Sequence, residues 1–81
     1  MLLKALYKNT TVWENDNSTI SDWLDKGARV VWTGTHRGRG TNDKPRVSRT
    51  RMPKASHWLL VYTPKGALGW VWSDDLKVVK R

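Results

Sequence analysis

The residues of this chain that could do chemistry are concentrated in one basic segment. Seven lysines and arginines and one acid, Asp43, lie between Arg37 and His57, whereas the rest of the 81-residue chain holds eight basic and six acidic residues. A local positive patch attracts anionic partners more selectively than charge spread over the whole surface. The side chains predicted to neutralise the phosphates of a nucleic acid are Arg37, Arg39, Lys44, Arg46, Arg49, Arg51 and Lys54.

The aromatic residues are the second unusual feature, because the chain has six tryptophans, two tyrosines and no phenylalanine. Tryptophan is favoured where an apolar surface meets water or a ligand, since its ring is apolar and its N–H needs a partner. Alternate residues of a strand share a face. If the aliphatic residues between them point inward, the outward side chains are Trp58, Trp70 and Trp72. These rings predict either a face that stacks bases or holds an extended chain, or a cap over a small core.

Several classes of protein are excluded by what the sequence lacks. The chain has no cysteine, which excludes a disulfide scaffold, thiol catalysis and cysteine metal ligands. Two histidines are too few for a histidine metal cage, and His57, beside Trp58, is interpreted as a histidine at a strand edge. No serine-nucleophile, phosphate-loop or paired-carboxylate motif is found. We therefore expect a non-enzymatic protein without a metal, a cofactor or a small-molecule substrate.

The location of the protein is predicted from two further absences. No apolar run approaches the ~18 residues of a membrane span. The first residues are interrupted by Lys4 and lack the apolar region of a signal peptide. We expect no membrane partner, and a location in the cytoplasm or in a virion.

The order of apolar residues favours strands over helices, because β-branched and aromatic residues cluster and no helical stripe is found. Strands are predicted over 4–7, 10–13, 28–33, 58–63, 67–72 and 76–79. Residues 20–24 are left open between a strand and a helical turn, and 73–75 are predicted as a short polar or 3₁₀ turn. The predicted core is Leu6, Val12, Leu24, Val30, Trp32, Leu59, Val61, Val71, Leu76 and Val78. The pattern indicates one all-β domain, residues 1–81, folded as a small barrel of five to six strands.

A basic insert, from about residue 37 to 56, interrupts these regular strands. It combines glycines and prolines with the arginines, which is typical of a loop. Residues 45–52 nevertheless contain enough β-forming residues to pair with 32–37 as a hairpin arm. Long loops in compact domains are uncommon and often functional when they are ordered.

Four short motifs occur in an order and at a spacing that resemble those of the SH3-type barrel, above all its bacterial variety. They are Ala5-Leu6-Tyr7, Leu24 to Val31, Trp58 to Val61, and Gly69-Trp70-Val71 followed by Leu76. The resemblance covers nearly the whole chain apart from the insert. It implies an SH3-like barrel in which Tyr7, Trp58 and Trp70 share one ligand surface. Trp72 and Asp75 stand where the family has the proline and tyrosine of its polyproline groove, so a Pro-x-x-Pro ligand is not expected.

Two functions are predicted from these features. The first is an SH3-like binding module for DNA or RNA, in which the basic insert follows phosphates and the aromatic face stacks bases. The alternative is an adaptor that binds an acidic or extended protein partner, such as a cell-wall peptide or a viral or phage assembly partner. Both predicted functions agree with the resemblance, which implies such ligands because bacterial SH3 domains bind cell-wall peptides and other small barrels bind nucleic acids. A third option is a small assembly protein whose sheet edge pairs with its neighbours.

Overall fold

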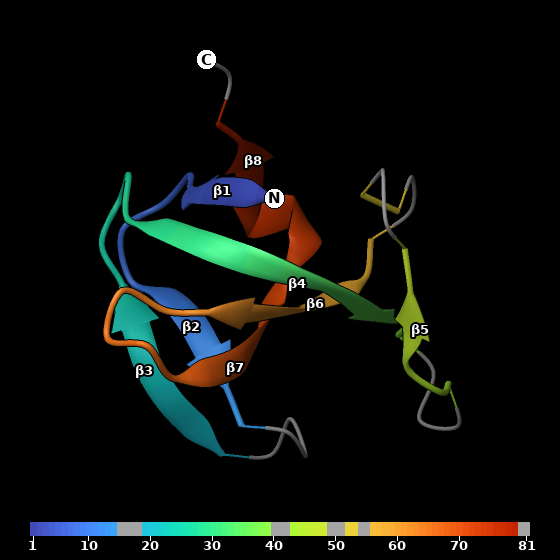
Figure 1. The fold of residues 1–81 in the computed structure, drawn as a ribbon. Helices are drawn as coiled ribbons and strands as arrows, with labels where there is room; N and C mark the ends of the chain where they lie inside the picture. Colours follow the sequence, from blue (N-terminus) through green and yellow to red (C-terminus); the bar gives the residue numbers. More distant parts are fainter. Residues whose placement is uncertain (15–18, 40–42, 49–51, 54–55, 80–81) are drawn as a thin grey trace.

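The computed structural model describes residues 1–14, 19–39, 43–48, 52–53 and 56–79, which form an all-β domain (Figure 1). The all-β prediction is confirmed. The described residues contain eight strands rather than the five or six expected. The strands are β1 (Leu2–Ala5), β2 (Thr10–Trp13), β3 (Ile20–Leu24), β4 (Arg29–Arg37), β5 (Arg46–Val47), β6 (Trp58–Tyr62), β7 (Leu68–Trp72) and β8 (Leu76–Val78), with the 3₁₀ turn η1 (Ser73–Asp75) before the last.

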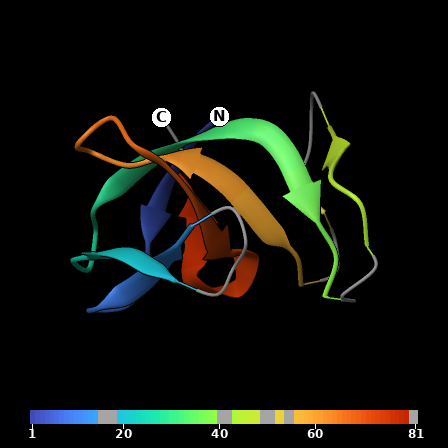
Figure 2. The same cartoon turned by 90° about the horizontal axis from the view of Figure 1, so that it is seen from below.

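All the strands belong to one antiparallel sheet. Its order is β3-β2-β7-β6-β4-β1-β8, and β5 pairs with β4 beside this path. Figure 2 shows the sheet curving, with β4 and β6 arching above β2 and β3. The prediction of a closed barrel is wrong. β3 and β8 stand at opposite ends of the strand order, and no hydrogen-bonded pairing among the described residues joins them. The sheet therefore curls around its core but keeps two open edges.

The core lies on the concave side of this sheet and follows the alternation of the strands. Eight of the ten predicted core residues are buried, whereas Leu6 and Val78 are only half-buried. Leu3 and Ala5 are buried in their place, because the first strand is β1 (Leu2–Ala5) and not residues 4–7. Alternate side chains of a strand point to opposite faces. The prediction placed Leu6 inside, in the opposite frame, and therefore missed both Leu3 and Ala5.

The remaining boundaries differ little from those predicted. Residues 20–24 form a strand, and the 3₁₀ turn at 73–75 is confirmed. β4 runs to Arg37, four residues beyond its predicted end at 33, because β5 pairs with this extension. No helix in the described part of the chain is long and apolar enough to cross a membrane.

Gly34 is the residue that lets the insert return onto β4. The pairing of β4 with β6 shifts register between Trp32 and His36, and Gly34 within this bulge has a φ of 94°. A Cβ atom at Gly34 would stand 2.8 Å from the Ser48 carbonyl oxygen. The backbone N–H of Ser48 donates to the Gly34 carbonyl at 2.8 Å. The close approach and the positive φ both favour glycine at this position.

Candidate functional site

Three tryptophans from three strands surround a pocket of about 370 Å³ on the outer face of the sheet. Trp58 is central, with ring centroids 4.8 Å from Trp72 and 6.4 Å from Trp13, both edge to face. All three side chains are partly exposed. Thr11, Arg39 and Asp75 complete the lining. We call this cavity the tryptophan pocket.

The register of the sheet explains how residues distant in sequence meet in this pocket. Trp58 pairs with Trp72 of β7 and with Arg37 of β4, and Trp13 of β2 pairs with Trp70. Paired residues point to the same face of a sheet. Because the intervening Leu59 is buried, this shared face is the outer one.

Trp70 lies on that face, but it is buried and cannot offer its ring to a ligand. Only 4% of the residue is exposed. The Arg37 guanidinium carbon lies 5.3 Å from the centre of its ring, which is a cation–π contact. The expectation that Trp70 contributes to an exposed aromatic surface is therefore wrong. The outward direction of Trp70 was predicted from alternation, but the arginine that covers its ring comes from β4, which is separated from β7 by β6.

Tyr7 is also absent from the pocket. It is 58% exposed in the turn between β1 and β2, and it is not among the described residues that line the cavity. Trp13 contributes to the pocket in its place. Its strand was predicted correctly, and alternation about the buried Val12 turns Trp13 to the outer face, but only the register with β7 brings it beside the other rings.

Charged groups border the tryptophan pocket on two sides. The guanidinium carbon of Arg39 lies 5.5 Å from the centre of the Trp72 ring. Asp74 Oδ2 accepts hydrogen bonds from Trp72 Nε1 at 3.2 Å and from the Ser56 hydroxyl at 2.5 Å. Burial and the neighbouring Asp74 raise the pKa of Asp75. A cation and a hydrogen-bond acceptor therefore border the same aromatic surface.

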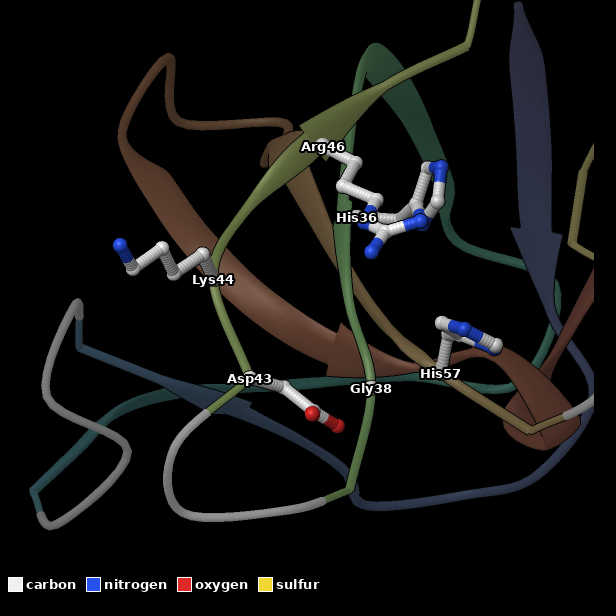
Figure 3. A pocket seen from close by; sticks show the side chains of 6 residues that line it. All are labelled: His36, Gly38, Asp43, Lys44, Arg46 and His57. Carbon is white, nitrogen blue, oxygen red and sulfur yellow. The ribbon is translucent and has the colours of Figure 1, made fainter.

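The basic insert forms a second pocket of about 250 Å³, lined by His36, Gly38, Asp43, Lys44, Arg46 and His57 (Figure 3). Arg46 is paired with His36 by the β4–β5 register, and its side chain lies against that ring. The Lys44 side chain points away from His36, and Asp43 turns toward Gly38. Arg46 and the two histidines therefore form its basic side.

The surroundings of His36 in this second pocket disfavour its protonated form. Its Nε2 lies 3.0 Å from the Ser48 hydroxyl, and its ring centre is 5.3 Å from that of His57. Burial, His57 and Arg46 together lower its pKa below 6.5. Protonation would place a further positive charge among these groups, so the pocket gains charge when the pH falls.

The predicted basic residues fall into two groups. Arg37 and Arg39 lie beside the tryptophans, and Lys44 and Arg46 lie on the returning segment. Arg49, Arg51 and Lys54 lie outside the described residues. The choice between a loop and a hairpin is settled for one short part of the insert, because Arg46 and Val47 pair with His36 and Thr35.

Comparisons with known proteins supply no relative for this chain. No protein-family model, no curated protein and no solved structure matches it. Among the described residues, no group of three or more histidine, aspartate or glutamate side chains is placed to hold a metal ion. The function must therefore be argued from the geometry of the two pockets.

Proposed function

We propose that this protein is a non-enzymatic module that binds single-stranded nucleic acid. The observation that carries the proposal is the tryptophan pocket, in which Trp13, Trp58 and Trp72 surround one cavity and Arg39 lies over the last ring. Aromatic platforms beside basic side chains are the common means of holding a single strand without strong sequence preference.

The pocket favours unpaired bases over a duplex. A base stacked on an aromatic ring gains about 1–3 kcal/mol, but a base inside a duplex already stacks on its neighbours. The carboxylate of Asp75 at the pocket is a hydrogen-bond acceptor, which suits the amino groups of adenine, cytosine and guanine.

The basic residues would hold the backbone of the same strand. Arg39, Lys44 and Arg46 are exposed, and the sequence adds three further basic residues between 49 and 54. Each phosphate that is neutralised releases condensed counterions, so affinity should fall steeply as salt rises. For about six phosphate contacts to a single strand, log affinity should fall with log salt with a slope of about −4.

A titration with oligonucleotides tests this function. Single-stranded and double-stranded oligonucleotides of the same sequence are added at about 50 mM and about 200 mM salt, while tryptophan fluorescence is followed. We expect quenching, tighter binding of the single strand, and weaker binding at the higher salt. Fluorescence that does not change with either oligonucleotide, or an affinity independent of salt, would contradict the proposal.

A peptide-binding adaptor is the second candidate, and one observation favours it. Asp75 borders the tryptophan pocket and Asp74 is its neighbour, while Arg39 already shows that a guanidinium fits over Trp72. A cationic side chain of an extended peptide would find both a ring and a carboxylate there. In that case a short arginine-containing peptide, and not an oligonucleotide, would quench the tryptophans.

The fold is best interpreted as SH3-like with an open ladder. Gly27, in the turn that precedes β4, has a φ of 85°, as the lysine–glycine turn of the resemblance requires. Gly69-Trp70-Val71 lies within β7, and Leu76 begins β8 after one 3₁₀ turn. These features support the relationship that the motifs imply.

A further inference from the structure

A row of exposed apolar side chains crosses four neighbouring strands of the sheet, away from both pockets. Leu2 of β1 pairs with Val31 of β4, Val31 pairs with Tyr62 of β6, and Tyr62 pairs with Leu68 of β7. Their exposed fractions are 38%, 47%, 46% and 46%. We call these four residues the apolar row.

The apolar row is a contiguous patch and not a set of single exposed side chains. Single exposed apolar side chains are ordinary, but contiguous ones mark interaction surfaces. Neighbouring strands are about 4.8 Å apart, so the row is about 14 Å long. Tyr62 lies four residues from Trp58 on β6, about 13 Å along the strand. The row is therefore separate from the tryptophan pocket.

A second row, of positive charges, lies beside the β4 and β1 end of the first and continues onto β8. Lys4 pairs with Lys77 of β8 and with Arg29 of β4, and all three are exposed. Lys4 and Arg29 stand two residues from Leu2 and Val31 on the same strands, so they share the outer face at a distance of about 7 Å. We call these three residues the basic row.

The basic row is unfavourable for the isolated domain. Like charges on directly opposed strand positions destabilise a sheet. None of the three side chains makes an ion pair with another described residue. An acidic partner that seats on this face would relieve the repulsion.

We propose that this outer face docks an acidic amphipathic helix of a partner protein, with its apolar side on the apolar row and its carboxylates on the basic row. The spacing favours a helix that lies across the strands. A helix rises about 5.4 Å per turn, close to the 4.8 Å between strands, so successive turns meet successive strands. Alternate residues of an extended segment are about 7 Å apart and would not match.

Other occupants fit this face less well. A nucleic acid would meet the basic row, but Tyr62 is the one ring of the apolar row, and its other three side chains are aliphatic and offer bases no ring on which to stack. A second copy brings a chain of net charge +8 and a basic row of its own, so two such faces repel one another. The acidic helix satisfies both rows at once.

The test uses the full chain and a fluorescently labelled peptide as the probe. The peptide is a designed helix with leucines at positions i, i+4 and i+7 and glutamates along one flank, and its control is a scrambled peptide of equal composition. Binding is measured by anisotropy. We expect the wild-type chain to bind the patterned peptide at least about tenfold more tightly than the scrambled one. Equal affinity for the two peptides overturns the proposal.

Two variants locate the contact. Val31→Ser combined with Tyr62→Ser should weaken peptide binding by at least about tenfold, and Lys4→Glu combined with Arg29→Glu should do the same. Lys8→Glu combined with Lys44→Glu has the same net charge as the second variant and should bind normally. Circular dichroism confirms that each variant is folded. Equal binding by all variants refutes the assigned face.

Two further measurements separate this inference from the other possibilities. Val31→Ser with Tyr62→Ser should leave oligonucleotide binding unchanged, so failure of one proposal does not imply failure of the other. Vesicles of phosphatidylcholine with phosphatidylserine are the second probe. Sedimentation of the wild-type chain with these vesicles, lost in the same variants and without selective peptide binding, would assign the face to a membrane and overturn the helix.

Discussion

Replacement of Trp58 by alanine is the sharpest test of the tryptophan pocket. Of the three tryptophans that line the pocket, only Trp58 contacts both of the others. Its ring centroid lies 4.8 Å from that of Trp72 and 6.4 Å from that of Trp13. The change removes one stacking surface, so we expect the loss of about 1–3 kcal/mol of binding free energy, or about 5-fold to 150-fold in affinity. It also removes two edge-to-face contacts, each worth about 0.5–1.5 kcal/mol, from the free energy of unfolding.

The assay is anisotropy of a labelled single-stranded oligonucleotide, with thermal unfolding measured in parallel. Trp58→Phe keeps a ring at this position and should retain most of the affinity. Tyr7→Ala is the matched control, because Tyr7 is an exposed aromatic outside the pocket. An affinity of the folded Trp58→Ala protein within about twofold of wild type would refute the stacking argument.

Four further predictions follow from the same geometry. Arg39→Gln should weaken oligonucleotide binding and lower the slope of log affinity against log salt by about 0.7, whereas Lys8→Gln should leave that slope nearly unchanged. The lowered pKa of His36 means that its contribution to stability is present above about pH 6.5 and is lost as the pH falls through the folded-state pKa. The melting temperature should therefore be lower at about pH 5 than at about pH 7.5, and His36→Gln should reduce that difference. The raised pKa of Asp75 means that ionised Asp75 destabilises the fold at neutral pH, so Asp75→Asn should melt higher there and lose the advantage below about pH 4. Gly34→Ala should lower the free energy of unfolding by about 1 kcal/mol or more, measured in urea, because Gly34 has a positive φ and a Cβ there would meet the Ser48 carbonyl. Gly66→Ala is the control and should cost less, because Gly66 also has a positive φ but has open space around it.

Local patterns were sufficient to predict most of the strands. Alternation along residues 58–62 and 68–72 placed Leu59, Val61 and Val71 inside and the tryptophans on the outer face, because alternate residues of a strand point to opposite faces. The same reasoning failed for β1, where Leu2 and Leu3 are both apolar and the frame is ambiguous. One residue of shift reverses which side chain is buried.

The composition of the tryptophan pocket depends on contacts between strands, which no local pattern reports. Trp70 was expected to be exposed and is buried, because Arg37 of β4 covers it. Trp13 was overlooked because only the register of β2 with β7 brings it to the other rings. Tyr7 was placed there by the resemblance alone. The sequence thus predicted an exposed tryptophan cluster and two of its members, Trp58 and Trp72, but not Trp13.

The open edges of the sheet link the net charge of this chain to its self-association. The outer edges of β3 and β8 keep backbone groups that could continue a sheet into a neighbouring molecule. A net charge of +8 opposes such contact between identical molecules. On the proposed nucleic acid, phosphates would neutralise this repulsion between neighbouring copies, so edge pairing would be opposed less there than in free solution.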